Sequence, residues 1–128
     1  MIFLLEKKKF FPMILFLLVA VEIFFISSIP GSRTGSGIPL TAIVYHFCVF
    51  FLFSFFLFFT IIGNKKPDKY LIFVVFLSSL AYAVIDEIHQ SFVPLRSSSV
   101  EDVLVDFIGI TLSLVIAVFI SKKSSQEY

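Results

Sequence analysis

A cluster of titratable and hydrogen-bonding side chains ends one of the most apolar runs of this chain. The run is YLIFVVFLSSLAYAV, and it leads into VIDEIHQ, which carries Asp86, Glu87, His89 and Gln90. Carboxylates and imidazoles serve in general acid–base catalysis, and both groups also bind metal ions. Their place at the end of an apolar helix needs a reason, because a charge in an apolar environment is costly unless it is paired.

A second polar stretch, RSSSVED, follows after a short turn and contains Arg96 and Asp102. Ser98 with Glu101, or Ser99 with Asp102, has the spacing of a capping box at the start of a helix. A helix N-terminus beside an arginine could also seat a phosphate or another anion. Capping explains the serines more simply, because the acids of the first turn compete for the same partial charge.

The composition is that of a membrane protein. Of the 128 residues, 59% are hydrophobic and 15% are charged, whereas soluble domains have about 45–50% apolar and about 25% charged residues. Four apolar segments, each near the ~20 residues of a spanning helix, are separated by Gly-, Pro- or Ser-containing connections. The sequence therefore predicts an all-α, four-helix membrane domain over residues 10–120. It is flanked by a basic N-terminus (1–9) and a tail (121–128), and its helices lie at about 10–29, 40–62, 69–91 and 101–120.

The lysines and arginines predict the orientation of these helices. Eight of the ten lie in the N-terminus, the second connection and the tail, and the other two lie in the first and third connections. Because cytoplasmic segments carry the excess of positive charge, both termini and the second connection are predicted to be cytoplasmic. The first helix is expected to be retained, since its apolar stretch exceeds the ~7–15 residues of a signal peptide. The predicted location is the cell membrane, with several crossings.

The ionisable residues of the four segments are predicted to form one layer. At a rise of 1.5 Å per residue, each of the four segments has at least one ionisable residue roughly 6–11 Å below the outer ends of the helices. On the last segment, polar and small residues also repeat with the spacing of one helix face, which suits close helix packing. The layer contains Glu22, His46, Asp86, Glu87 and Asp106, and the stripe consists of Asp102, Asp106, Gly109 and Ser113.

The joined motif AYAVIDEIHQSFVPLRSSSVEDVLVDFIG resembles the signature of the VanZ-like family of membrane proteins. The resemblance spans roughly residues 45–113, and Leu95 departs from it at a position where the family has a turn glycine. It implies a role at the cell envelope and, in some members, low-level resistance to teicoplanin. The matching positions are His46, Phe47, Phe50, Glu87, Gln90, Pro94, Arg96, Asp102, Asp106 and Gly109.

Three functions are compatible with these residues. In the first, the layer binds the headgroup of an envelope lipid or lipid-linked precursor, and the predicted ligand-binding residues are His46, Gln90, Arg96 and Asp106. In the second, the protein also modifies such a lipid, with Glu87 and Asp102 as the catalytic acid–base pair. In the third, the buried polar side chains only hold the helices in register or hold a partner protein. The first function is the preferred interpretation.

Other ligands are not predicted. No cofactor and no metal is expected, because no compact motif such as H-E-x-x-H is present; a mixed set of Asp86, Glu87, His89 and Asp102 is the weaker metal alternative. The net charge of +1 gives no indication of a nucleic-acid partner. Transport is disfavoured, because the inner halves of the helices lack ionisable groups and no polar path crosses the membrane.

Overall fold

The computed structural model describes residues 10–31, 39–63, 65–96 and 98–124, which form four helices and no strand. All four helices are long and apolar enough to cross a membrane, so the all-α, multi-pass prediction is confirmed. The predicted N-terminus 1–9, Arg33 and the end of the tail lie outside the described residues. The helices are α2 (Phe10–Ser27), α3 (Leu40–Ile62), α4 (Lys69–Ser91) and α5 (Val100–Ser124).

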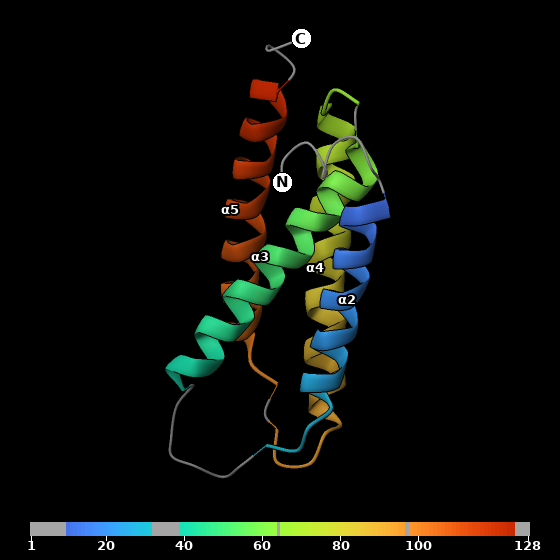
Figure 1. Cartoon of the computed structure of the whole chain (residues 1–128). Helices are drawn as coiled ribbons and strands as arrows, with labels where there is room; N and C mark the ends of the chain where they lie inside the picture. Colours follow the sequence, from blue (N-terminus) through green and yellow to red (C-terminus); the bar gives the residue numbers. More distant parts are fainter. Residues whose placement is uncertain (1–9, 32–38, 64, 97, 125–128) are drawn as a thin grey trace.

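The helices run up and down, so each end of the bundle gathers four helix ends (Figure 1). The start of α2, the end of α3, the start of α4 and the end of α5 lie at one end, near the connection 63–68. The polar stretches at the end of α4 and the start of α5 lie at the opposite end. The lysine pattern predicts that this polar end faces outward.

The core of the bundle is built around α3, which packs against each of the other three helices. Its largest side chains are phenylalanines, and Phe50, Phe58 and Phe59 are fully buried. Large apolar side chains also cover the outside of every helix, as expected for a surface in contact with lipid. Both the buried face and the outer face of each helix are apolar, so hydrophobicity alone does not distinguish them. Packing between helices decides which residues are buried.

The stripe predicted on the last helix faces the inside of the bundle. Asp102, Asp106, Gly109 and Ser113 are all buried in α5. At Gly109 an added Cβ would lie only 2.7 Å from the carbonyl oxygen of Phe47 on α3. Glycine is therefore required where α3 and α5 approach closely, and this approach brings the acids of α5 to α3.

The turn between α4 and α5 contains a strained residue. Leu95 has φ 60°, in the left-handed region, which costs a residue with a Cβ roughly 1–2 kcal/mol. The turn contacts the segment after α2, where the amide of Gly31 donates to the carbonyl of Pro94 at 3.1 Å. A Cβ on Gly31 would overlap the carbonyl of Leu95, so the two segments touch through backbone.

Leu95→Gly is expected to stabilise the protein by about 1 kcal/mol, because glycine adopts positive φ without the Cβ penalty. The exposed Leu95 side chain contributes little packing that could be lost. The midpoint of thermal unfolding in detergent measures the effect. Val93→Gly is the matched control in the same turn, because Val93 has no positive φ, and it should be neutral or destabilising. Equal shifts from both substitutions would contradict the strain at Leu95.

Candidate functional site

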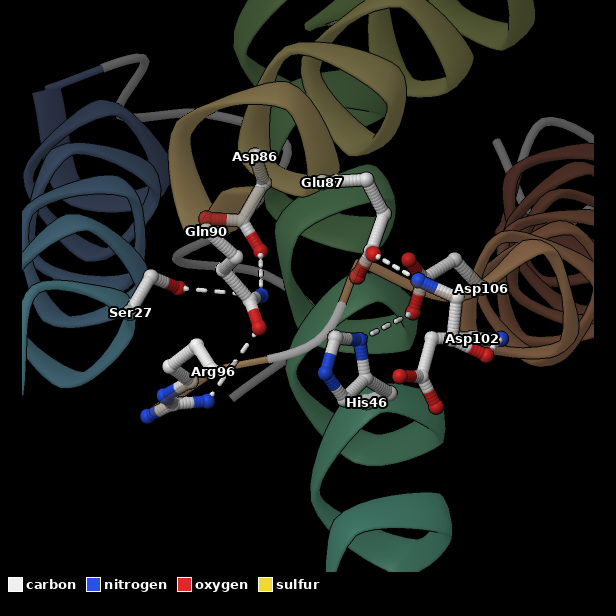
Figure 2. A network of polar contacts seen from close by, with 9 residues as sticks. Ser27, His46, Asp86, Glu87, Gln90, Arg96, Asp102 and Asp106 are labelled. Carbon is white, nitrogen blue, oxygen red and sulfur yellow. Dashed lines mark hydrogen bonds and ion pairs between the residues drawn. The ribbon is translucent and has the colours of Figure 1, made fainter. Parts of the chain in front are cut away.

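Four ionisable side chains from three helices meet at the polar end of the bundle. His46 comes from the second turn of α3, Glu87 from the last turns of α4, and Asp102 and Asp106 from the start of α5. All four are buried, with exposed fractions of 3%, 4%, 6% and 0% in that order. Figure 2 shows them converging on one another, and we call this set the acid–imidazole cluster.

The contact between His46 and Asp106 fixes the relation of α3 to α5. The Nδ1 atom of His46 lies 3.1 Å from Oδ1 of Asp106, and both residues are buried. An ionised carboxylate only accepts hydrogen bonds, so Nδ1 is the donor when Asp106 is charged. The contact orients the imidazole ring and places it at the centre of the cluster.

Glu87 links α4 to the first turn of α5. Its Oε2 accepts a hydrogen bond of 2.8 Å from the backbone amide of Ser99, and the hydroxyl of Ser99 accepts one of 3.3 Å from the amide of Asp102. In a capping box the carboxylate would come from the same helix. Here Glu87 of α4 accepts the hydrogen bond from the Ser99 amide instead, so the carboxylate of Asp102 can face the cluster.

Several carboxylate oxygens in the cluster lack a hydrogen-bond partner among the described residues. They are Oε1 of Glu87, Oδ1 of Asp102 and Oδ2 of Asp106, and each is shielded from solvent. One ligand atom each from His46, Glu87 and Asp102 lies within 4.8 Å of the other two. Buried acceptors without partners are costly, so the cluster is suited to a ligand that supplies positive charge or hydrogen-bond donors.

Arg96 belongs to a second polar group, beside the cluster (Figure 2). Its three guanidinium nitrogens donate to the carbonyl oxygens of Ile26 and Ile29 at 2.6 and 3.1 Å and to Oε1 of Gln90 at 3.2 Å. Gln90 in turn donates to Asp86 at 2.8 Å, and its amide lies 3.5 Å from the hydroxyl of Ser27. This group ties the end of α4 and the following turn to the last turn of α2.

The structure divides the six predicted site residues between the two groups. His46, Glu87, Asp102 and Asp106 share the acid–imidazole cluster, while Gln90 and Arg96 hold one another in the second group. Ser27 was not predicted as a site residue. The only feature of the sequence that pointed to it is its polar side chain near the end of the first apolar segment.

Other polar residues of the first and third apolar segments lie outside the cluster. His89 contacts the hydroxyl of Ser28 at 3.0 Å and stacks on Phe24 with ring centroids 5.1 Å apart. Glu22 is exposed. The mixed metal set considered from the sequence included His89 and Asp86, but the structure brings His46 to Glu87 and Asp102 instead.

An apolar cleft opens between α3 and α5. It has a volume of about 250 Å³. Phe47 follows His46 in the sequence and Val105 precedes Asp106, so the cleft lies at the same level of the bundle as the His46–Asp106 pair. The cleft is lined by Ile43, Val44, Phe47, Val105 and Ile108.

Comparison with known proteins identifies the family. The sequence model of the VanZ/LLP1 family matches residues 3–121. The chain belongs to the VanZ/LLP1 family. The match includes α2, α3, α4, most of α5 and both polar groups, and it confirms the VanZ-like resemblance. No curated protein and no solved structure matches this VanZ/LLP1 protein significantly.

Proposed function

We propose that this VanZ/LLP1 protein binds the headgroup of an envelope lipid or lipid-linked precursor in the acid–imidazole cluster. The observation that carries the proposal is a buried set of acceptors without hydrogen-bond partners among the described residues, with an apolar cleft at the same level of the bundle. A ligand that fits both must be amphiphilic. Its polar part would lie against Glu87 and Asp102, and an acyl or prenyl chain would follow the cleft between α3 and α5.

The chemistry of the cluster favours a headgroup with hydrogen-bond donors. The free oxygens of Glu87, Asp102 and Asp106 can only accept when ionised, so sugar hydroxyls or an amine are suitable partners. The guanidinium of Arg96 is engaged by carbonyls and by Gln90, so it contributes less to anion binding than the sequence suggests. With the polar end facing outward, a lipid of the outer leaflet reaches the site without crossing the hydrocarbon core.

Catalysis on the bound lipid would use the same residues. Glu87 and Asp102 are the proposed acid–base pair, because each has a buried oxygen that is free to exchange a proton with a headgroup. His46 has a ring nitrogen within 4.8 Å of a carboxylate oxygen of each and could relay a proton. The link to teicoplanin resistance rests on the family, and the susceptibility of cells that lack the gene tests it.

The alternative function is purely structural. The bonds from Arg96 and Gln90 to α2 hold helix ends in register, and such bonds favour a role in assembly or in holding a partner protein. This explanation fits the second polar group better than it fits the acid–imidazole cluster. In the cluster three carboxylate oxygens make no hydrogen bond to another helix among the described residues.

Glu87→Gln and Asp102→Asn are expected to reduce retention of the bound lipid about tenfold or more. Each removes a charged acceptor, and a hydrogen bond to a charged group contributes about 1.5–3 kcal/mol. The fold should survive, because a glutamine at 87 can still accept from the Ser99 amide, and no side-chain bond of Asp102 is lost. Native mass spectrometry of the protein, extracted in mild detergent with the chelator EDTA present, measures the lipids that co-purify.

Glu101→Gln is the matched control, since Glu101 is an exposed acid next to Asp102 and its loss should leave lipid retention unchanged. Helicity by circular dichroism checks that all variants are folded. Equal lipid retention in wild type and in both site variants would refute the proposal and favour the structural alternative.

A further inference from the structure

The acid–imidazole cluster has the composition of a metal site. One nitrogen and two carboxylate oxygens, from His46 on α3, Glu87 on α4 and Asp102 on α5, lie within 4.8 Å of one another. Around a tetrahedral ion with bonds of about 2.0–2.1 Å, ligand atoms are about 3.3 Å apart. The separations of up to 4.8 Å exceed this value by at most about 1.5 Å, a difference that side-chain rotation can close.

Unpartnered atoms point to a ligand independently of this spacing. Oε1 of Glu87 and Oδ1 of Asp102 are shielded from solvent and have no hydrogen-bond partner among the described residues, although both side chains are more than nine-tenths buried. Figure 2 shows both carboxylates directed towards His46. Buried carboxylates are normally paired or bound to a metal.

The charges of the cluster also call for a cation. Three carboxylates, Glu87, Asp102 and Asp106, are buried around a single imidazole. Arg96 forms no direct ion pair with them among the described residues, because its guanidinium nitrogens donate to two carbonyls and to Gln90. A bound divalent cation would offset two of the three negative charges.

From these observations we infer that His46, Glu87 and Asp102 bind one divalent transition-metal cation. Imidazole nitrogen with carboxylate oxygen suits Zn²⁺ and Mn²⁺, while the absence of thiolate in this set disfavours softer ions. Asp106 is a positioning residue: in metal sites the histidine commonly donates its second ring N–H to a carboxylate, and Asp106 stands beside the imidazole at 3.1 Å. The inference concerns the proposed lipid site but does not require it, because a cation can bind without a lipid.

The test uses the full-length protein in detergent after removal of metals with EDTA and without added lipid. Addition of Mn²⁺, followed by the loss of its free-ion electron paramagnetic resonance signal, and addition of Zn²⁺, followed by calorimetry, measure the stoichiometry. At least one of the two ions should bind at one equivalent per chain. The bound ion should also raise the midpoint of thermal unfolding of the wild-type protein.

Variants assign the binding to the cluster. His46→Gln, Glu87→Gln and Asp102→Asn should lose the one-to-one binding, and Asp106→Asn should weaken it about 10–100-fold. Glu101→Gln removes an exposed acid next to Asp102 and should bind like the wild type.

Two results would overturn the inference. One is the absence of stoichiometric binding of both ions to folded wild-type protein, which requires no variant to interpret. The other is equal binding by the wild type and by folded Glu87→Gln and Asp102→Asn variants, which would indicate adventitious binding elsewhere. Either result leaves the lipid proposal to its own test, since that test is made with chelator present.

Discussion

Arg96→Gln should lower the free energy of unfolding by about 3 kcal/mol. The guanidinium satisfies the carbonyl of Ile26 in the last turn of α2, the carbonyl of Ile29 beyond it, and the side chain of Gln90 on α4. Hydrogen bonds to charged groups contribute about 1.5–3 kcal/mol each, and two of the three are partly buried. A shorter neutral side chain cannot reach both helices, so the end of α2 would lose its link to the turn after α4.

The measurement is unfolding in mixed micelles, followed by helicity. Arg96→Lys should be intermediate, because a lysine keeps the charge but lacks the planar arrangement of donors that reaches several acceptors. Lys122→Gln is the control for loss of an exposed positive charge and should have little effect. If Arg96→Gln unfolds like the wild type, the arginine is not a structural link, and the anion seat predicted from the sequence becomes the better explanation.

The sequence was sufficient for the helices and for the shared level of His46, Glu87 and Asp106 along the bundle. Both follow from local properties: a run of ~20 apolar residues specifies a spanning helix, and a rise of 1.5 Å per residue specifies depth. His46, Glu87 and Asp106 were therefore placed at one level before their partners were known. The burial of the stripe on α5 followed from its spacing in the same way.

The partners of individual side chains could not be predicted, because they depend on helix rotation. Asp86 and Glu87 are adjacent, but the first contacts Gln90 on its own helix and the second contacts the start of α5. Successive residues point about 100° apart on a helix. If the predicted rotation of α4 is wrong by one residue, the contacts of Asp86 and Glu87 are therefore exchanged. The contacts of Arg96 with Ile26 and Ile29 span about 70 positions and carry no signal in sequence spacing.

The last prediction separates a register role of the cluster from a binding role. His46→Leu and Asp106→Leu, made singly, should each destabilise the protein by about 3–5 kcal/mol, because each leaves a buried polar partner unpaired. The double variant should recover much of this loss, since apolar side chains that replace both members of a buried pair are often neutral. A double-mutant cycle from unfolding in mixed micelles gives the coupling free energy.

Ser54→Ala is the control for a buried polar group on α3. The hydroxyl of Ser54 has no partner among the described residues, so its loss should change stability little.

A folded, stable double variant can then be assayed for lipid and cation. If the pair only sets helix register, the double variant should keep both ligands, whereas a binding role requires that it lose them, because His46 and Asp106 are then absent from a bundle that is otherwise intact. Additive single effects without coupling would contradict a direct interaction between the two side chains.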